Sequence, residues 1–383
     1  MTHQKSKLTI DDIGKRLGLT PQFLFEAAKT AETQYELFDL PKKSGGARTI
    51  CTPKGELKRV QRAILEELLQ QFEMPEFVHG CVKGRSIVTN AKPHVDKPLV
   101  LKIDIKDFFG SIKPARVLEI YKDIFDCDEK SAEALTALTT YGNFLPQGAP
   151  TSPALANLVA LPLDRTLLDI CEQSGLQYDY TRYVDDITIS GDSRLGQLLA
   201  AFYKAIQHHG FIASPGKLKV SRPCNRQKVT GIIVNKKMAP PKKLIRKIRQ
   251  QLYYCEKFGL EDHCQKEGIE EEEFLDRING MLGFIRLTQP VTADLFKSKL
   301  TRLQKFELVD QDESILLLLK LAVEEERHVI FSYHEATRKV APVEIFIDDD
   351  GFKFMRGYQT MPEPKWERYL IPDIRSLRIF EKL

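Results

Sequence analysis

Three aspartates interrupt sequence that is otherwise apolar and rich in β-branched residues. Asp185 and Asp186 lie within the β-rich stretch 178–191, and Asp104 follows the apolar run 98–103. Two adjacent acids are ordinary residues of a tight turn, and that interpretation stays open. A carboxylate beside a hydrophobic core is nevertheless costly unless a cation compensates its charge. The three side chains are therefore candidates for a shared cation site.

The ligand type determines the chemistry of such a site. If the strand that ends at Asp104 lies beside the 178–191 hairpin, three carboxylates converge. An acid-rich site with oxygen ligands suits Mg²⁺ or Mn²⁺. Two such ions about 4 Å apart would activate an attacking hydroxyl and stabilise the leaving oxygen of a phosphoryl transfer. The pattern is consistent with nucleotidyl transfer, which spacing alone does not decide.

The spacing of apolar residues predicts the elements that position these aspartates. Residues 98–105 indicate a strand, and residues 178–191 indicate a hairpin with Asp185 and Asp186 at its tip. Gly45-Gly46 separates two apolar runs in a second predicted hairpin. The remaining elements expected from the pattern are that hairpin at 35–53, helices at 55–72 and 151–174, a strand at 228–238, and a mostly helical region at 242–310.

Two short amphipathic helices are expected between residues 8 and 33. Thr20 is suited to cap the second helix, and Pro21 suits its first position. Such a pair could form a DNA-reading helix-turn-helix. No base-contacting residues stand out in it, so a helical cap on the following domain is the favoured interpretation.

Composition excludes several classes of protein. The 383 residues are 42% hydrophobic, which supports a core divided among two or three domains. No run approaches the roughly 18 apolar residues of a membrane-spanning helix. The first residues lack the apolar core of a signal peptide. The seven cysteines form no CxxC pair and are odd in number, which predicts a reduced, cytoplasmic protein without a membrane partner.

The net charge of +4 is unevenly distributed along the chain. Residues 1–310 carry 46 basic and 39 acidic side chains, whereas residues 311–383 carry 11 and 14. Residues 217–250 hold twelve Lys or Arg and no acid. Such a block is often only solvated surface, but it also has the composition of a surface that contacts a phosphate backbone. Charge alone favours a nucleic-acid partner.

Five segments in a fixed order carry a family resemblance. They are Leu40–Arg48, His79–Ser86, Ile103–Phe109, Leu145–Pro153 and Tyr183–Asp186. The last resembles the YxDD box of reverse transcriptases, and the others resemble that family's fingers hairpin, second finger element, first aspartate motif and QGxPTSP segment. The similarity covers roughly residues 35–300. It implies an α+β right-hand polymerase with fingers, palm and thumb.

The resemblance assigns roles to the acidic residues. Asp104 and Asp185 would bind metal directly, and Asp186 would be a ligand or a close partner. The carbonyl of Ile105 would complete the shell of one ion. The implied cofactor is a pair of Mg²⁺ ions, for which Mn²⁺ could substitute.

The resemblance also implies a site for deoxynucleoside triphosphates. Phe109 matches a steric gate that would clash with a 2′-hydroxyl, whereas Phe108 suits the core. Gln147 would lie under the incoming nucleotide and template. Arg48 would bind the triphosphate, because its fork of donors suits phosphate oxygens. Lys43 matches the same hairpin more loosely.

Two short motifs narrow the family. Asn90–His94 fits NAxxH and Val229–Gly231 fits VTG, although each could be an ordinary loop or strand. Placed around a polymerase core, they resemble retron reverse transcriptases. The resulting candidates for RNA binding are Asn90, His94, Val229, Thr230, Gly231, Lys236, Lys237, Lys242, Lys243 and Arg246.

A retron enzyme would bind its own structured noncoding RNA and start from the 2′-hydroxyl of an internal guanosine. It would copy part of that RNA into a branched RNA–DNA hybrid (msDNA), within an antiphage defence system. Its partners would be that RNA, the DNA product and an effector protein, with the oligomeric state left open. The alternatives are another bacterial defence or intron-type reverse transcriptase, and an inactive RNA-binding scaffold. Intact carboxylates argue against the scaffold.

The end of the chain is predicted to be a separate module. Its helix and short strands resemble the WYL domain, a small, mostly β, barrel-like module of bacterial defence regulators. Arg338 and Arg368 match basic positions of that family and are candidate ligand contacts. The expected domains are a helical cap at 1–34, fingers and palm at 35–238, a helical thumb at 239–311 and the WYL-like module at 312–383.

Overall fold

A four-stranded antiparallel sheet holds the segments in which the three aspartates lie. This computed structural model describes residues 7–41, 45–307, 312–334, 336–348 and 351–380. The sheet has the order β4-β5-β3-β6. Its strands are β3 (Leu99–Asp104), β4 (Tyr178–Tyr183), β5 (Asp186–Gly191) and β6 (Lys219–Ser221). The predicted strand and hairpin are therefore confirmed.

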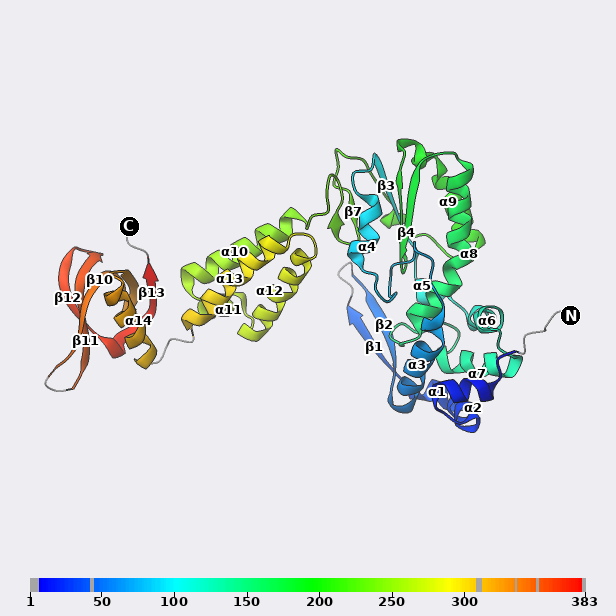
Figure 1. Ribbon diagram of the computed structural model, residues 1–383, viewed down its shortest axis with the longest axis horizontal. Coiled ribbons are helices and arrows are strands. Elements are labelled where there is room, and N and C mark those ends of the chain that lie inside the picture. The colour runs from blue at the N-terminus through cyan, green and yellow to red at the C-terminus, as the bar shows by residue number, and fades with distance from the viewer. Residues whose placement is uncertain (1–6, 42–44, 308–311, 335, 349–350, 381–383) are drawn as a thin grey trace. The chain divides into compact units, whose positions relative to one another are not determined.

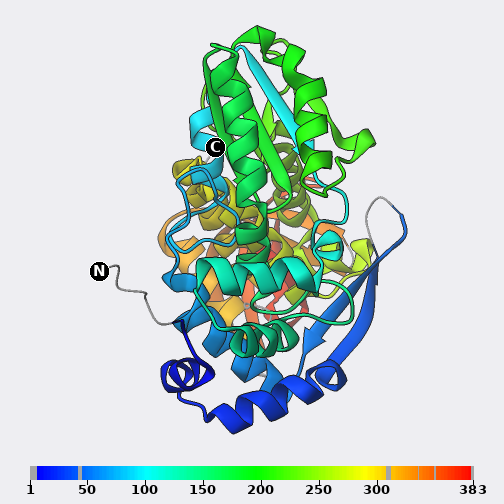
Figure 2. The ribbon, with the colours of Figure 1, turned by 90° about the vertical axis from the view of Figure 1, so that its right-hand side faces the viewer.

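Two helices cover one face of this sheet (Figure 1). They are α8 (Ser152–Gln173) and α9 (Leu199–His208), and Figure 2 shows them in front of the strands. Leu101 and Ile103 of β3, Ile189 of β5 and Leu163 of α8 are all at most 1% exposed and belong to one core. Strand residues that point to this face are apolar, as expected for a sheet packed on helices.

The N-terminal elements lie beside this core. Thr9 forms a capping box with Asp12, and Thr20 caps the next helix with Pro21 at its first position, as predicted. The predicted second hairpin is also present, with Tyr35 opposite Pro53. The elements are α1 (Ile10–Leu17), α2 (Pro21–Thr30), β1 (Tyr35–Pro41), β2 (Ala47–Pro53), α3 (Gly55–Glu67), α4 (Ile87–Ala91), α5 (Phe108–Ser111), α6 (Pro114–Glu119) and α7 (Glu129–Thr139).

The prediction of a single strand at 228–238 is wrong. The structure has two two-residue strands instead, β7 (Lys228–Val229) and β8 (Ile232–Ile233), which pair antiparallel. Thr230 and Gly231 between them have φ angles of 42° and 97°. Left-handed backbone at two successive residues reverses the chain, so an extended strand cannot continue through them.

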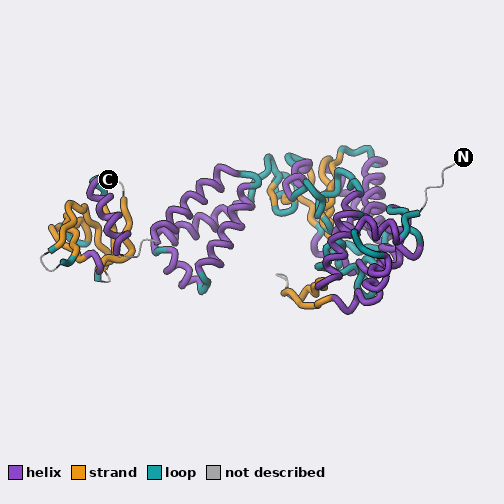
Figure 3. Tube along the Cα trace, turned by 60° about the horizontal axis from the view of Figure 1, so that its bottom comes forward, coloured by secondary structure: helices purple, strands orange, loops and turns teal. Residues whose placement is uncertain are grey.

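The chain divides into two compact units, Met1–Ala239 and Pro240–Leu383. The second unit begins with the helices α10 (Lys242–Phe258), α11 (Leu260–Glu267), α12 (Glu271–Arg286) and α13 (Pro290–Glu307), which Figure 3 shows as an all-helical segment. Ile248, Leu252, Phe274 and Ile278 form its core. No helix among the described residues is long and apolar enough to cross a membrane.

The final module is an open five-stranded sheet with one covering helix. Its strand order is β12-β11-β10-β9-β13. Among the described strands, the two edge strands β12 and β13 do not pair with each other, so the sheet does not close. The prediction of a barrel-like module is therefore wrong. Ile315, Leu319 and Ala322 of the helix cover the apolar face that a closed barrel would bury inside. The elements are α14 (Asp312–Glu324), β9 (His328–Tyr333), β10 (Ala336–Ile347), β11 (Lys353–Met361), β12 (Lys365–Leu370) and β13 (Ile374–Phe380).

An ion pair joins the four-stranded sheet to α8 in the interior of the first unit. Arg182 of β4 and Asp164 of α8 are both 0% exposed, with Nε–Oδ1 at 2.8 Å and Nη2–Oδ2 at 2.8 Å. The hydroxyl of Tyr180 donates to the same carboxylate at 2.6 Å. Of the three remaining N–H groups of the guanidinium, two donate to the side-chain and main-chain oxygens of Asn157, and the third donates to the carbonyl of Val184.

We expect Asp164→Asn to destabilise the first unit by about 3–5 kcal/mol, because it leaves a buried guanidinium without its counter-charge. Urea unfolding followed by far-UV circular dichroism would measure the change. The single tryptophan of the chain is Trp366, so its fluorescence follows the second unit and supplies an internal reference. Glu129→Gln breaks an exposed ion pair with Lys122 and should cost less than about 1 kcal/mol. Equal losses for the two variants would contradict the importance of the buried pair.

Candidate active site

Strand register brings the three aspartates together. Asp104 at the end of β3 lies opposite Asp186 at the start of β5, and Tyr183 lies opposite Asp186 across the β4–β5 hairpin. Asp185 therefore occupies the turn, and its carbonyl accepts a 2.9 Å hydrogen bond from the amide of Ile105. The predicted convergence of the two segments is observed for the backbone.

The turn that carries Asp185 is stabilised by contacts with Arg182 and Gly80. Val184 has a φ of 58°, an unusual conformation for a β-branched residue. Its carbonyl accepts a hydrogen bond of 3.1 Å from Arg182. Gly80 packs so closely beneath the turn that an added Cβ would lie 2.5 Å from Val184. Asn157 donates to the Gly80 carbonyl at 2.8 Å, so the same network supports both segments.

Lysines compensate two of the three carboxylates. The ammonium of Lys217 lies 2.8 Å and 2.9 Å from the two oxygens of Asp104, and Ser214 donates to Asp104 at 2.6 Å. Lys102 lies 3.0 Å from Asp186. Among the described residues, no three His, Cys, Asp or Glu side chains are grouped closely enough to hold a metal ion. The aspartate backbones converge, but the carboxylates of Asp104 and Asp186 are each paired with a lysine.

Asp185 differs from its neighbours in its environment. Burial raises the pKa of its carboxyl, and the negative charges of Asp104 and Asp186 add to that rise, while its own backbone amide and Lys217 oppose it. A cation placed here would relieve both the repulsion and the burial penalty. The donor set of carboxylates, with the nearby carbonyl of Ile105, fits Mg²⁺ in its chemistry. These are the residues that could hold a metal.

Two phenylalanines follow the Asp104 strand in different environments. Phe108 is 3% exposed and packs against Phe211, with ring centroids 5.5 Å apart. Phe109 is only half-buried, and its ring meets Phe108 edge-on at 5.7 Å. Because the two side chains differ in this way, Phe108 is the core residue and Phe109 is the one available to a ligand.

The Gln147 loop and the β1–β2 hairpin lie against each other. The amide of Cys51 donates to the carbonyl of Gln147 at 2.8 Å. Gly148 has a φ of 126°, and a Cβ there would lie 2.9 Å from the carbonyl oxygen of Cys51. Arg48 is exposed on the same strand as Cys51. Lys43 lies outside the described residues.

Comparison with known proteins identifies the family. A family model described as "Reverse transcriptase (RNA-dependent DNA polymerase)" matches residues 40–238. The retron Mx65 reverse transcriptase of Myxococcus xanthus is 33% identical over 302 residues, covering 74% of this chain and 68% of that protein. The chain belongs to the retron reverse transcriptases. It is accordingly an RNA-directed DNA polymerase.

Other relatives of this reverse transcriptase give the same result. The retron Mx162 enzyme of Myxococcus xanthus is 32% identical over 334 residues, covering 76% of this chain and 66% of that protein. The retron Ec86 enzyme of Escherichia coli is 31% identical, with coverages of 67% and 81%. The match thus spans about two thirds of the length of the two Myxococcus proteins. A structure of telomerase from Candida albicans aligns with a TM-score of 0.42 at 13% identity, over 76% of this chain and 60% of that chain.

The two short retron-like motifs are largely internal. Asn90, His94 and Val229 are all 0% exposed, while Thr230 and Gly231 are half-buried. A direct contact between the buried side chains and RNA stays a prediction, and their burial favours a role inside the protein. The basic candidates are exposed, and they are Lys236 and Lys237 in the first unit and Lys242, Lys243 and Arg246 on α10 in the second.

The two arginines predicted as ligand contacts lie on different strands of the final sheet. Arg338 on β10 is half-buried, and Arg368 on β12 is exposed. The guanidinium of Arg368 lies 5.5 Å from the ring centroid of Phe354. The strand β11 separates the two arginine strands, and the structure gives no direct contact between their side chains.

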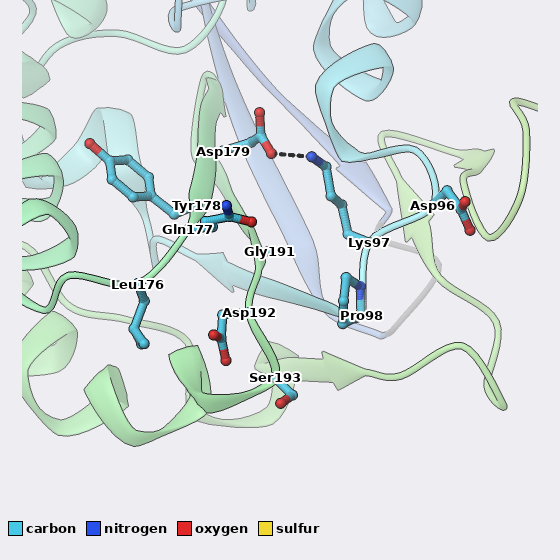
Figure 4. A pocket seen from close by; sticks show the side chains of 10 residues that line it. All are labelled: Asp96, Lys97, Pro98, Leu176, Gln177, Tyr178, Asp179, Gly191, Asp192 and Ser193. Carbon is cyan, nitrogen blue, oxygen red and sulfur yellow. Dashed lines mark ion pairs between the residues drawn. The ribbon is translucent and has the colours of Figure 1, made fainter.

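A pocket of about 840 Å³ lies at the end of the four-stranded sheet that is remote from Asp104, Asp185 and Asp186. Leu99 pairs with Gly191 at this end, five positions along β3 from Asp104. Figure 4 shows that Lys97 and Asp179, which both line the pocket, form an ion pair, with Nζ and Oδ2 2.6 Å apart. The pocket is therefore separate from the three aspartates.

Sequence reasoning missed the charged residues that support the site. Lys102, Asp164 and Arg182 were not recognised, and Lys217 was noted only as part of the basic block. A signal for Asp164 exists, because it lies on the apolar face of its helix, four residues after Ala160 and three before Leu167. An acid at that position implies a buried basic partner. The identity of the partner depends on tertiary structure.

We expect Phe109→Val to raise ribonucleotide incorporation by about tenfold relative to deoxynucleotides, because a smaller side chain removes the clash with a 2′-hydroxyl. Single-nucleotide extension with matched rNTP and dNTP would measure the ratio. Phe108→Leu is the matched control, since it alters a neighbouring ring in the core and should affect stability without changing sugar selectivity. An unchanged ratio in Phe109→Val would remove Phe109 from the gate.

Proposed function

We propose that this reverse transcriptase copies part of its own structured noncoding RNA into a branched RNA–DNA hybrid, msDNA, with two Mg²⁺ ions at the aspartates. The observation that carries the proposal is the register that places Asp104 opposite Asp186, with Asp185 in the turn between β4 and β5. The relatives named above are retron reverse transcriptases, which supports msDNA as the product.

Asp104, Asp185 and the carbonyl of Ile105 would hold the metal ions, with Asp186 as a ligand or close partner. When bound, the ions would activate the attacking hydroxyl and neutralise the departing diphosphate. Lys217 now occupies both oxygens of Asp104, so it must leave at least one of them for a metal to bind. The priming group would be the 2′-hydroxyl of an internal guanosine, held in line with the α-phosphate.

The remaining residues would select and orient the nucleotide. Arg48 on β2 would bind the triphosphate through paired donors. Gln147, bonded through its carbonyl to the same strand, would lie under the nucleotide and template. Phe109 would exclude the ribose 2′-hydroxyl. Lys43 would be a further nucleotide-binding residue.

We assign fingers and palm to residues 35–238, a thumb to 239–311 and a helical cap to 1–34. The basic block would contact the phosphates of the noncoding RNA, because structured RNA is recognised largely through shape and backbone. The WYL-like module at 312–383 would serve in sensing or assembly. Arg338 and Arg368 would bind its ligand, and an effector protein would be its partner. The system would act in antiphage defence.

We expect nucleic acid extracted from the enzyme purified from its host to contain branched DNA. Treatment with RNase and with debranching enzyme should each change its mobility on a denaturing gel. Asp185→Asn combined with Asp186→Asn should yield the RNA without attached DNA, since the site loses two carboxylates but keeps its hydrogen bonds. DNA insensitive to debranching would indicate another kind of reverse transcriptase. DNA synthesis by the double variant would exclude the palm assignment.

We expect replacement of Lys236, Lys237, Lys242, Lys243 and Arg246 by Gln to weaken RNA binding and flatten its salt dependence. Each lost phosphate contact should lower the slope of log K against log salt by roughly 0.7–0.9. Filter binding between about 50 and 200 mM salt would measure it. Exposed Lys15, Lys29 and Lys130 lie outside the block, and their replacement by Gln is the control. Equal slopes for both sets would show that the block is only solvated surface.

A further inference from the structure

The two retron-like motifs contact each other inside the first unit. The side-chain amide of Asn90 donates to the hydroxyl of Thr230 at 3.3 Å, although 140 positions separate them in the sequence. That hydroxyl in turn donates to the carbonyl of Ile87 at 3.2 Å. Asn90 is fully buried, and its Oδ1 has no hydrogen-bond partner among the described residues. One polar group of each motif therefore binds the other.

Two more hydrogen bonds join the same pair of segments. The amide of Asp96 donates to the carbonyl of Val234 at 2.9 Å. The side chain of Gln227, which is 0% exposed, donates to the carbonyl of Lys97 at 2.8 Å. Residues 87–97, here called the bridging segment, are thus attached at both ends to the β7–β8 hairpin.

The opposite side of the bridging segment holds the catalytic hairpin. His94 is 0% exposed, with Nε2 2.8 Å from the hydroxyl of Thr181 on β4 and Nδ1 2.6 Å from the hydroxyl of Ser190 on β5. Burial lowers the pKa of His94 to about 3, with Lys97 and His79 adding to the effect. A neutral imidazole has one donor and one acceptor nitrogen, and a hydroxyl can accept either role.

The connection reaches the acidic turn through β4. Thr181 also donates to the carbonyl of Asn90 at 3.5 Å. The next residue on the strand is Arg182, whose guanidinium supports the turn before Asp185. Hydrogen bonds thus run from Thr230 through the bridging segment to the hairpin that carries Asp185.

We infer that the bridging segment couples the Val229–Gly231 turn to the β4–β5 hairpin, and that Asn90 and His94 are positioning residues that act without touching RNA. The inference rests on the proposed function, because that turn would meet the noncoding RNA. Exposed Lys228, Lys236 and Lys237 flank the turn and suit a phosphate backbone. RNA bound at this turn would fix the position of Thr230. Through Asn90 it would also fix the turn that carries Asp185.

This assignment differs from both simpler interpretations. If Asn90 contacted RNA, its loss would weaken RNA binding and leave the rate at saturating RNA unchanged. If Asn90 only stabilised the fold, its loss would lower synthesis on every template equally. A coupling residue lowers the rate on the cognate RNA relative to a generic template, with RNA affinity nearly preserved.

The experiment compares Asn90→Ala, Thr230→Ala and the double variant in the full-length enzyme. The cognate noncoding RNA and a poly(rA)–oligo(dT) primer–template are the two substrates. We expect the ratio of cognate to generic rate to fall about tenfold in each single variant, with RNA Kd within about threefold of wild type. The double variant should be no worse than either single variant, because both remove the same hydrogen bond. Thr230→Ser, which keeps the hydroxyl, should restore the ratio.

His94→Ala provides the second arm, since it removes the side-chain hydrogen bonds that join the bridging segment to Thr181 of β4 and Ser190 of β5. It should lower the ratio of cognate to generic rate, as Asn90→Ala does, and Thr181→Ser should retain the wild-type ratio because the hydroxyl remains. Gln61→Ala is the control for loss of a buried amide. Gln61 is 0% exposed and donates to Tyr35 and to the carbonyl of Leu138, away from the hairpin. It should alter stability without altering the ratio of rates.

The outcomes separate this inference from the proposed function. A tenfold loss of RNA affinity in Asn90→Ala with an unchanged saturated rate would make Asn90 an RNA contact and overturn the coupling. Additive losses in the double variant, or an unchanged ratio of rates, would overturn it as well. Failure of the wild-type enzyme to copy its cognate RNA would instead refute the proposed function, and the wild-type control reports that independently.

Discussion

The geometry of the acidic turn depends on a charge pair that is removed from water. Taking a guanidinium and a carboxylate into the interior costs several kcal/mol per ion, and the loss is recovered only when every donor and acceptor is satisfied. Arg182 meets this condition through Asp164, Asn157 and the carbonyl of Val184. A pair of apolar side chains could fill the same volume, but it could not bind that carbonyl. The interaction therefore links α8, β4 and the turn in one defined geometry.

The charges of the three aspartates explain which of them are paired with lysines. Three carboxylates at the end of one sheet repel one another, and Lys102 and Lys217 offset two of them. Asp185 has no such lysine contact, and burial raises its pKa. Because Lys217 is largely exposed, with 65% of its side chain accessible, its hold on Asp104 is open to exchange with solvent cations. A divalent ion would place two positive charges where the single ammonium charge of Lys217 now lies. The carboxylates would therefore bind the metal ion in preference to the lysine.

Local patterns in the sequence were enough for most of the first unit. The pattern of apolar and β-branched residues around Asp104 and Asp185 predicted the strands, and Thr20-Pro21 predicted the start of a helix. Both signals act over only a few residues. The different roles of Phe108 and Phe109 were implied by the resemblance to reverse transcriptases rather than by a local pattern. Contacts such as Asn90 with Thr230 or Arg182 with Asp164 depend on packing of distant segments, and no local signal names the partner. The open final sheet was missed because α14 covers its apolar face, a choice that strand patterns do not reveal.

The position of the two motifs changes how RNA selectivity would arise. Asn90 and His94 direct hydrogen bonds to Thr230, Thr181 and Ser190, which leaves only Oδ1 and the second amide N–H of Asn90 for a base edge. Asn90 is fully buried, so a base could not reach these groups without an opening of the surrounding structure. Recognition by shape and phosphate contact needs no such opening, because the surrounding lysines are already exposed. Selectivity would then reside in whether an RNA fits the β7–β8 hairpin well enough to hold it rigid, and the buried motifs would convert that fit into an ordered aspartate turn.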